Sequence, residues 1–549
     1  MSNDRDVAFP TLTVAEVQAL SVRGTRREVR TGEILYQEGD RDHSFFVVLE
    51  GAVEVLDNSR GAPHQLTVHR RGQFSGDVDL MSSRVTLVTG RVIEDGAVLQ
   101  LSIPELRRAV DEMPDLGDKI LKAFLMRRTL ILADGFQGVR IIGSRFSPEA
   151  HQLRDFASRN AIPIRFMDVE TDHEAESILR GLGISAAETP IVLGSAGQFH
   201  RKPSIAQFAN CAGLTAVLEP EHVYDLIVVG AGPAGLAASV YAASEGLDVL
   251  TADALAAGGQ AGTSARIENY LGFPAGISGA DLTQNALIQA QRFGARITVP
   301  VSARSLGIDG GDRIVTLVDG RRLRTRCVLV ASGVAYRKLD VPRFSEFEGA
   351  GIYYAATEME AKLCRGEEVV VVGAGNSAGQ AVVFLSRHAS RVHLIVRSDD
   401  LGRSMSRYLV DRVQGLENVN ICCQTVVSGL EGNGHLSAVE LKTGSTRETI
   451  PTSSLFLFIG ADPKTDWLRN CVELDRKGFV LTGNWLPQET ASNERWRAAG
   501  RSPFLLETSL PGVFAAGDVR SGSTKRVAAA VGEGSMAVSF VHAHIGRPV

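Results

Sequence analysis

The sequence predicts a multidomain protein with an N-terminal β-barrel and helices, then a small α/β domain, then two doubly wound α/β domains. The chain has 549 residues, whereas single domains usually contain about 100–200 residues. Short strand-like segments crowd the beginning of the chain. Farther on, two glycine-rich motifs each follow an apolar run and precede a helical pattern. Alternating strands and helices around such motifs are typical of doubly wound domains.

The composition is that of an ordinary globular protein, with 44% apolar and 22% charged residues. A net charge of -5 gives no general reason to expect nucleic acid or an anionic membrane as a partner. The most apolar stretch, residues 226–243, is interrupted by glycine and proline. It therefore predicts a buried strand, turn and helix, and no membrane span.

The first residues, MSNDRDVAFP, lack the charged-then-apolar layout of a secretory signal, so we expect a cytoplasmic protein. The chain has 6 cysteines, and no two of them form a C-x-x-C pair. This pattern favours a reducing compartment, and it predicts neither a disulfide framework nor a thiolate metal site.

Residues 1–135 predict a β-barrel closed by helices. Thr-Gly, Glu-Gly-Asp and Glu-Gly separate short apolar segments, a spacing that is typical of antiparallel strands. After residue 102, apolar residues recur at helical spacing. The strands are expected at residues 28–30, 34–37, 44–49 and 52–56.

Residues 136–220 predict a small α/β domain in which strands and helices alternate. Pro148 near the start of its first helical pattern fits the first turn of a helix. We expect three strands and two helices, with the sequences VRII, IRFMDV and TPIVL for the strands and PEAHQLRDFASR and HEAESILRGL for the helices.

The first glycine motif follows the strand pattern YDLIVV and opens a helical pattern. Its glycines, Gly230, Gly232 and Gly235, satisfy G-x-G-x-x-G, with Pro233 and Ala234 inside the motif. Such glycines permit a tight turn and a close approach of the backbone to a pyrophosphate, which then faces the positive end of the helix. Asp253 ends the next strand, where an acid can hold a ribose hydroxyl. The motif therefore predicts a dinucleotide site.

The second motif follows the strand pattern EEVVVV and has Gly373, Gly375 and the small Ala378, with Asn376 and Ser377 between them. The next strand ends in Arg397 instead of an acid, followed by Ser398 and Arg403. An arginine at this place can pair with a 2′-phosphate, which favours NADPH over NADH. The alternative is that these arginines are solvated surface residues.

Two further segments, GGQAGTSARIENYLGFP at 258–274 and GVFAAGDVRSGSTKRVAAAVGEGSMAV at 512–538, resemble signatures of the thioredoxin reductase family of flavoproteins. The resemblance implies FAD in the first site and an NAD(P)H-binding domain at 340–455, inserted between the FAD-binding segments 221–339 and 456–549. It also implies a homodimer. The residues that it places around FAD are Gly259, Gln260, Asn269, Gly517, Asp518, Arg526, Val527 and Ala528.

Residues 10–130 resemble a cyclic-nucleotide-binding domain, through TGEILYQEGDRDHSFFVVLEGAVEVL. Members that bind the nucleotide use Gly-Glu for the ribose and an Arg directly before Ser/Thr for the phosphate. This chain has Gly76-Asp77, and Val85 stands before Thr86 with Arg84 one place early, which in a strand faces the other side. Because a charge-assisted partner is lost, we expect a regulatory or dimerising module and doubt that it binds a cyclic nucleotide.

The middle domain resembles a thioredoxin-like fold, with Thr189-Pro190 where that fold has a cis-proline. At the turn that would hold C-x-x-C, the sequence is Ser144-Arg145-Phe146-Ser147. Serine does not carry out disulfide exchange, so this domain is expected to lack dithiol chemistry.

The dithiol of the reductase family is missing as well. In dithiol members, C-A-T-C precedes the second nucleotide motif; here Ala355-Ala356-Thr357-Glu358 stands in its place. Cys364 has no cysteine nearby in sequence, and the adjacent pair Cys422-Cys423 has poor geometry for a working disulfide. Buried structural roles are expected for all three.

These observations predict an FAD-dependent oxidoreductase that passes hydride equivalents from NADPH to an acceptor not reached through a local dithiol. Cysteine-free relatives that act as ferredoxin–NADP reductases make ferredoxin or flavodoxin plausible by resemblance, beside a quinone or small oxidant. One alternative is a thioredoxin-disulfide reductase with a dithiol supplied elsewhere. Another is a redox sensor that signals through the barrel. Glu358 is a weak catalytic candidate, since an exposed loop carboxylate is the plainer interpretation.

Overall fold

The computed structural model describes residues 2–40, 43–58, 63–77, 80–81, 86–133, 138–194, 199–215, 218–219, 221–264, 267, 269–348, 350–354, 356 and 358–546. The chain divides into two compact units. The first comprises Met1–Ser144, Leu153–Leu218 and Ile288–Pro300, and the second comprises Arg145–Gln152, Glu219–Leu287 and Val301–Val549. Within the described ranges, no helix combines the length and the apolar character that a membrane crossing requires.

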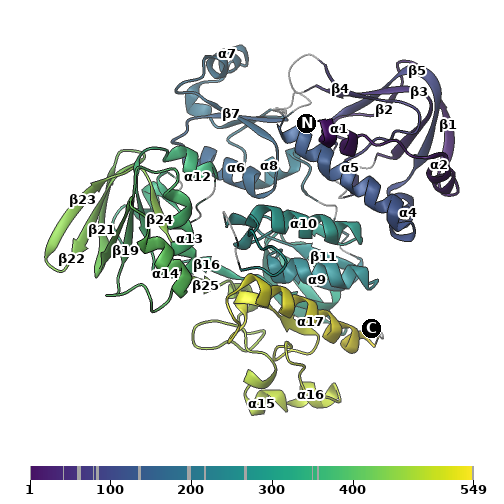
Figure 1. Ribbon diagram of the computed structural model, residues 1–549. Coiled ribbons are helices and arrows are strands. Elements are labelled where there is room, and N and C mark those ends of the chain that lie inside the picture. The colour runs from purple at the N-terminus through teal and green to yellow at the C-terminus, as the bar shows by residue number, and fades with distance from the viewer. Residues whose placement is uncertain are drawn as a thin grey trace. The chain divides into compact units, whose positions relative to one another are not determined.

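The first unit begins with an antiparallel sheet in the order β1-β5-β3-β4, with β2 paired to β5 (Figure 1). The aromatic side chains of Phe45, Phe74 and Phe124 meet in the core between this sheet and the helices. The elements are α1 (Ser2–Ala8), α2 (Val14–Ser21), β1 (Thr25–Val29), β2 (Ile34–Tyr36), β3 (Phe45–Asp57), β4 (His64–His69), β5 (Thr89–Leu101), α4 (Ile103–Glu112) and α5 (Pro114–Ala133).

One expectation about this sheet was wrong. Two strands were predicted at 44–49 and 52–56, but β3 continues through both, with irregular pairing to β5 around Glu50 and Ala52. Gly51 has φ +81°, and a side chain there would lie 2.4 Å from the backbone oxygen of Glu94. The Glu-Gly step is therefore a bulge inside one strand, because glycine permits both this backbone conformation and the close approach of β5.

The rest of the first unit contains a four-stranded sheet in the order β7-β6-β8-β9. The pair β6–β7 is parallel, while β8 is antiparallel to both β6 and β9. The Thr189–Pro190 bond is cis, where the sequence resemblance placed a cis-proline. The elements are β6 (Val139–Gly143), α6 (Pro148–Arg159), β7 (Ile164–Asp168), α7 (His173–Gly181), η1 (Ala186–Glu188), β8 (Ile191–Leu193), β9 (Phe199–Arg201), α8 (Ile205–Cys211) and, in the later segment, β12 (Arg296–Thr298).

The second unit contains a first sheet whose strands follow the order β11-β10-β15-β14-β13, with β26 beside β15. Helix α17 packs along α9 (Figure 1), and Gly534 permits this approach, because a side chain there would lie 2.1 Å from the backbone oxygen of Ala234. The elements are β10 (Val223–Val229), α9 (Pro233–Ser244), β11 (Val249–Ala252), η2 (Ala261–Thr263), α10 (Gly279–Arg292), β13 (Ala303–Asp309), β14 (Asp312–Leu317), β15 (Arg322–Val330), β26 (Val513–Ala515), η5 (Gly517–Val519) and α17 (Val527–Ile545).

A second parallel sheet, in the order β17-β24-β18-β19-β20, is formed by residues that lie between these segments in the sequence. The strands of a separate three-stranded sheet, β21-β22-β23, follow β20 and precede β24 in the sequence. The elements are β16 (Val334–Tyr336), α11 (Phe344–Phe347), β17 (Ile352–Tyr353), α12 (Glu358–Leu363), β18 (Glu368–Val372), α13 (Asn376–Leu385), β19 (Arg391–Val396), α14 (Arg407–Gln414), β20 (Val419–Cys423), β21 (Thr425–Gly432), β22 (Leu436–Thr443), β23 (Thr446–Pro451), β24 (Leu455–Leu457), β25 (Ala461–Pro463), η3 (Asp466–Leu468), η4 (Gly483–Trp485), α15 (Gln488–Ala491) and α16 (Glu494–Ala498).

Candidate dinucleotide sites

The first glycine turn joins the end of β10 to the start of α9, as the sequence predicted. Gly230 has φ +108°, and a side chain there would lie 2.2 Å from the backbone oxygen of Ala331. A side chain at Gly235 would lie 1.9 Å from the oxygen of Gly230. Both positions therefore require glycine, one for the turn and the other for the packing of the helix on it.

Asp253 holds this turn in place. Its Oδ2 accepts a hydrogen bond from the N–H of Ala231 at 2.8 Å, and its Oδ1 accepts from Leu255 at 2.8 Å and Ala256 at 3.0 Å. A carboxylate offers about four lone-pair sites. One acceptor position thus remains for a ribose hydroxyl, while the other three fix the backbone around it.

The segment predicted to line FAD packs directly on the first turn. The N–H of Gly258 donates to the oxygen of Ala231 at 2.7 Å. A side chain at Gly259 would lie 2.9 Å from the Cα of Gly232, so backbone faces backbone there. Gln260 donates from Nε2 to the oxygen of Val334 at 3.0 Å.

Asn269 is not part of this packed arrangement. Its side chain is exposed, and no hydrogen bond joins it to Gly259 or Gln260 in the described structure. A contact that the sequence did not predict comes instead from α10, where the Thr283 Oγ1 would lie 2.6 Å from a side chain at Gly258. No sequence motif points to Thr283, because this residue stands in an ordinary amphipathic helix.

Gly517 and Asp518 lie in the turn η5, against the start of α9. A side chain at Gly517 would lie 3.0 Å from the Cβ of Ala234. Glu533 of α17 accepts from the Gly517 N–H at 2.7 Å and from Arg520 Nη2 at 2.5 Å. Glu533 was not predicted as a site residue, because it is a single acid two turns inside a helix and matches no motif.

The charges around Asp518 are partly buried. Burial raises the pKa of Asp518, with Lys525 acting in the opposite direction. Burial also lowers the pKa of Lys525, whose Nζ donates to the backbone oxygen of Asp518 and stands over the Phe479 ring at 4.6 Å. Arg526 stands directly before α17, and Val527 and Ala528 follow it in the first turn, so this segment opens a helix as expected from the resemblance.

The second glycine turn joins β18 to α13. Gly373 has φ +148°, and a side chain there would lie 2.5 Å from the oxygen of Phe458 and 3.1 Å from the Cβ of Ala378. A side chain at Gly375 would meet nothing within 4 Å, so open space lies beside the start of the helix. Asn376 Oδ1 accepts from the N–H of Ser406 at 2.7 Å, and Ser377 is exposed in the first turn.

The arginines after β19 differ in their surroundings. Arg397 is exposed and forms no ion pair with any described residue. Arg403 instead pairs with Asp399 at 3.0 Å. Ser398 donates to the backbone oxygen of Asp400 at 2.8 Å. Arg397 is therefore the predicted residue that remains available to a phosphate.

The N-terminal ends of the helices show whether the residues of the predicted sites suit the binding of a dinucleotide. Helices α2, α4, α7, α8 and α16 each begin with a side chain that accepts from their first N–H groups. Helices α9, α13 and α17 begin at Gly232, Gly375 and Arg526 without such a side-chain cap, as do α11, α14 and α15, but only the first three begin in the predicted cofactor segments. Free N–H groups and a positive dipole suit a pyrophosphate or an anionic ring. The residues present therefore fit the cofactors expected.

Other predicted positions fall partly outside the described residues. Ala355 and Thr357 lie outside them, as does the side chain of Glu358, whose backbone starts α12. Ala356 is buried in the core of the second sheet. In the barrel, Arg84 and Val85 also lie outside the described residues, while the oxygen of Gly76 accepts from Arg127 Nη1 at 2.6 Å.

The cysteines are not arranged for disulfide chemistry. None of the six takes part in a disulfide. Burial raises the pKa of Cys364 to about 12, with nearby Glu367 adding to the shift. Burial likewise raises the pKa of Cys422. These thiols stay protonated at neutral pH, whereas exchange requires the thiolate.

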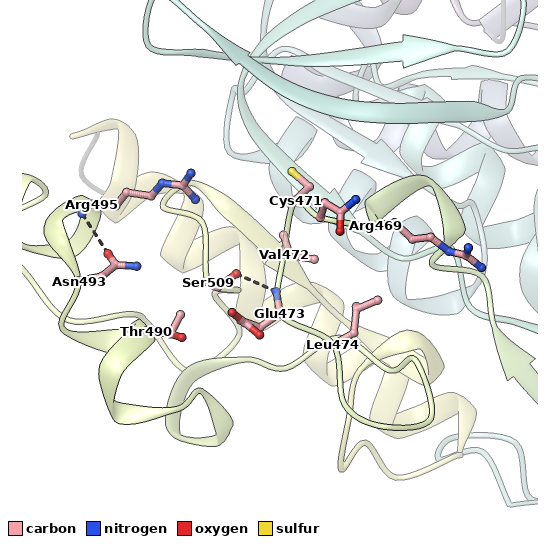
Figure 2. A pocket seen from close by; sticks show the side chains of 10 residues that line it. Arg469, Cys471, Val472, Glu473, Leu474, Thr490, Asn493, Arg495 and Ser509 are labelled. Carbon is pink, nitrogen blue, oxygen red and sulfur yellow. Dashed lines mark hydrogen bonds between the residues drawn. The ribbon is translucent and has the colours of Figure 1, made fainter.

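A polar pocket of about 530 Å³ lies away from the predicted cofactor residues, none of which lines it. Figure 2 shows Arg495 extending from one wall toward the wall that holds Cys471. Asn493 caps α16 through the N–H of Arg495 at 3.0 Å, and Ser509 accepts from the N–H of Glu473 at 2.9 Å (Figure 2). The pocket thus belongs to the segment after the second sheet, outside both glycine turns.

Comparison with known proteins connects this geometry to a family. The pattern described as Pyridine nucleotide-disulphide oxidoreductase matches residues 224–534, which is more than half of the chain, and the Cyclic nucleotide-binding domain matches residues 26–113. A thioredoxin reductase of Streptomyces clavuligerus is 33% identical over 57% of this chain and 92% of its own length. One from Bacillus subtilis (strain 168) is 32% identical over 60% and 96%.

The solved structure of T. acidophilum thioredoxin reductase superposes with a TM-score of 0.51 at 29% identity, covering 59% of this chain and 99% of that one. Both glycine turns and the 512–538 segment lie almost entirely inside the matched residues. The chain therefore belongs to the pyridine nucleotide-disulphide oxidoreductase family, as a thioredoxin reductase-like, FAD-containing oxidoreductase with FAD and NADPH as cofactors.

Proposed function

We propose that this enzyme takes two electrons from NADPH and delivers them to an acceptor without passing them through a dithiol of its own. The observation that carries the proposal is the sequence at two places. Residues 355–358 are Ala-Ala-Thr-Glu and residues 144–147 are Ser-Arg-Phe-Ser, where a dithiol enzyme of this architecture would hold cysteines. In the second unit, Phe146 stacks on His435 with ring centroids 4.5 Å apart, which gives this segment a packing role.

The remaining thiols do not replace the missing pairs. Cys364 is buried and its pKa is raised to about 12. Cys422 and Cys423 are neighbours on β20, where successive side chains point to opposite faces. A disulfide between adjacent strand residues is geometrically unfavourable. Direct transfer from the cofactor to the acceptor is therefore the route that the side chains support.

We assign the two cofactors to the two glycine turns. When bound, FAD would supply the chemistry of hydride acceptance from NADPH and of electron release singly or in pairs. Around FAD we place Gly230, Gly232, Pro233, Ala234, Gly235, Asp253, Gly259, Gln260, Asn269, Gly517, Asp518, Arg526, Val527 and Ala528. Around NADPH we place Gly373, Gly375, Asn376, Ser377, Ala378, Arg397, Ser398 and Arg403.

Within these sites the chain's own residues orient the ligands. Asp253 holds the turn before α9, and Glu533 holds the turn at Gly517, which lies against Ala234 in the first turn of α9. The open N-termini of α9 and α13 offer N–H donors to the pyrophosphates. Arg397 supplies the positive charge for the 2′-phosphate. No side chain of the described chain is needed as an acid, base or nucleophile.

The acceptor we favour is a one-electron carrier protein of the ferredoxin or flavodoxin class. One NADPH would then reduce two carrier molecules by one electron each, forming NADP+ and releasing one proton. A quinone or a small two-electron oxidant is the alternative acceptor, and Glu358 remains a weak candidate for handling its protons. A thioredoxin-disulfide reductase with an external dithiol is the competing activity.

The domain limits are part of the proposal. We infer a cyclic-nucleotide-binding-like domain at 1–135, a thioredoxin-like domain without C-x-x-C at 136–220, an FAD domain at 221–339 and 456–549, and an NADPH domain at 340–455. The order β7-β6-β8-β9 supports the thioredoxin-like assignment. We also propose a homodimer.

A second candidate function is a redox sensor that signals NADPH status through the barrel. It is favoured by the match of residues 26–113 to the Cyclic nucleotide-binding domain, which would join a ligand-binding type of module to the oxidoreductase. In this barrel Tyr36 is buried, and a side chain at Gly90 would lie 2.4 Å from its ring. Tyr36 is thus part of the packed core of the barrel, against β5.

Anaerobic reduction of the purified flavoprotein by NADPH, followed by a panel of acceptors, tests the proposal. We expect rapid flavin bleaching and turnover with a ferredoxin, flavodoxin, quinone or ferricyanide, but not with thioredoxin alone. Efficient NADPH-dependent reduction of thioredoxin would contradict it. Bleaching without turnover on any acceptor, accompanied by a change in assembly, would favour the sensor.

A further inference from the structure

The side chain of an exposed tryptophan packs against the loop that connects η5, the turn predicted to bind FAD, to α17. Trp485, at the end of η4, has 63% of its side chain exposed. A side chain at Gly522 would lie 3.5 Å from its ring, so the indole rests on the loop between η5 and α17. The N–H of Gly483 donates to the oxygen of Glu507 at 2.9 Å, which fixes the turn that carries the indole.

The same loop is joined to a turn that carries two exposed cations. Ser521 donates from its N–H to the oxygen of Val480 and from Oγ to Asp475 Oδ2, each at 2.8 Å. Asp475 faces inward, because it also accepts from the N–H groups of Lys477 and Phe479. The side chains of Arg476 and Lys477 are exposed at this turn.

Two more cations complete the surface. Lys525 stands over the Phe479 ring at 4.6 Å, and Arg526 is the exposed cap residue of α17. Arg476, Lys477 and Arg526 form no ion pair with other residues in the described ranges. These four cations and the indole form what we call the Trp485 surface: Arg476, Lys477, Trp485, Lys525 and Arg526.

The polar pocket, which is lined by both Arg495 and Glu473, adjoins this surface. Its wall runs through Leu474, directly before the turn of Arg476 and Lys477, and Arg495 projects from the facing wall without an ion-pair partner among the described side chains (Figure 2). The whole chain has a net charge of -5. Three cations without an ion-pair partner among the described residues, Arg476, Lys477 and Arg526, are therefore a local departure from the charge of the molecule.

We propose that the Trp485 surface docks a small acidic electron-carrier protein, which is the acceptor of the reaction. This inference rests on the proposed function and names its partner surface. Trp and Arg are the residues that most often dominate binding energy at interfaces. Exposed cations raise the association rate of an acidic partner, an effect that salt weakens. The loop under the indole also leads into α17, which begins beside the assigned flavin site.

A double charge reversal tests the surface without touching the assigned cofactor residues. The variant is Arg476→Glu/Lys477→Glu, and a second variant is Trp485→Ala. The matched control is Arg304→Glu/Lys442→Glu, which makes the same charge change at two exposed cations on β13 and β22. The probes are a bacterial ferredoxin and ferricyanide, with the NADPH-reduced holoenzyme at several salt concentrations.

We expect the charge reversal to raise the KM for ferredoxin about tenfold or more and to flatten its salt dependence. Trp485→Ala should raise the same KM by a similar factor. Ferricyanide reduction should stay unchanged in all variants, and the control should behave as the wild type with both acceptors. This combination would locate the carrier at the Trp485 surface.

Other results would overturn the inference in distinguishable ways. Unchanged ferredoxin kinetics in both variants would reject the surface but leave the proposed function intact. Reduction of ferricyanide or quinone, but of no acidic carrier, would do the same. Loss of self-association in Trp485→Ala, seen by sedimentation with normal ferredoxin kinetics, would assign the surface to a second copy of the chain. Absence of NADPH turnover with every acceptor would reject the proposed function itself.

Discussion

The Asp253 carboxylate accepts a hydrogen bond from the N–H of Ala231 at 2.8 Å, and so ties the end of β11 to the glycine turn after β10. The turn and the acid are therefore one unit, although the chain separates them by a whole helix. Its other oxygen fixes the turn that leads toward Gly258. The ends of β10 and β11, which flank the predicted flavin site, are therefore joined through this carboxylate.

Replacing Asp253 should weaken FAD binding. In Asp253→Ala three backbone N–H groups lose the carboxylate that accepts their charge-assisted hydrogen bonds. The ribose loses the same carboxylate. With about 1.5–3 kcal/mol for one such bond, we expect the dissociation constant of FAD to rise about 10- to 100-fold. Asp253→Asn keeps some of these hydrogen bonds, so its dissociation constant for FAD should lie between those of the wild type and of Asp253→Ala. Flavin absorbance after gel filtration measures the loss; full retention in Asp253→Ala would contradict the assignment.

Alanine substitutions at the two glycines of the second turn should have different effects. One should mainly raise the KM for NADPH, and the other should mainly lower the stability of the fold. Gly375→Ala places its methyl group in open space, so stability should change by less than about 0.5 kcal/mol while the KM for NADPH rises. Gly373→Ala demands φ +148° and meets the oxygen of Phe458 at 2.5 Å, so it should cost about 1–3 kcal/mol of stability. Thermal unfolding and NADPH titration separate the two effects. An unchanged KM in Gly375→Ala would argue against a phosphate beside α13.

Arg397→Ala should discriminate between the two pyridine nucleotides. Because the guanidinium is exposed and has no described ion-pair partner, its loss should raise the KM for NADPH about tenfold and leave that for NADH unchanged. Arg391→Ala is the control, since Arg391 is exposed at the opposite end of β19 and is not assigned to either cofactor. Steady-state kinetics with ferricyanide measure both. Equal effects on NADPH and NADH would show that Arg397 does not read the 2′-phosphate.

His544 should make the stability of the second unit depend on pH. Burial, assisted by Arg313, lowers the pKa of His544 from 6.5 to about 4, and Arg501 lies 2.9 Å from its Nδ1. The unfolded chain therefore binds a proton that the folded chain rejects, and stability falls as pH drops from about 6.5 to about 4. His544→Gln removes this dependence, which amounts to roughly 2 kcal/mol between pH 7 and pH 5. Urea unfolding at both pH values should show it; parallel pH slopes would refute the role.

The local parts of this structure were predictable from the sequence. The strand, turn and helix around Gly230 and around Gly373 depend on residues within one short segment, so spacing alone indicated them. The Glu50-Gly51 step misled the strand prediction, because a turn and a bulge use the same glycine conformation. Only the partner strand β5 distinguishes the two.

Contacts between distant segments were not predictable. Glu533 holds Gly517 from inside α17, and Thr283 supports Gly258 from α10. No motif marks either residue, because a single acid or threonine inside a helix is usually a surface residue. The Trp485 surface is similar: the fold brings Arg476, Trp485 and Lys525 together through backbone contacts of Ser521 and Gly522.

The central claim is that no dithiol of this chain takes part in electron transfer, and a stoichiometric anaerobic titration tests it most directly. The holoenzyme is titrated with dithionite while flavin absorbance and free thiols are followed. We predict that one two-electron equivalent per FAD completes the reduction and that the thiol count stays constant. Uptake of a second two-electron equivalent with the appearance of two new thiols would reveal a redox-active disulfide and contradict the account.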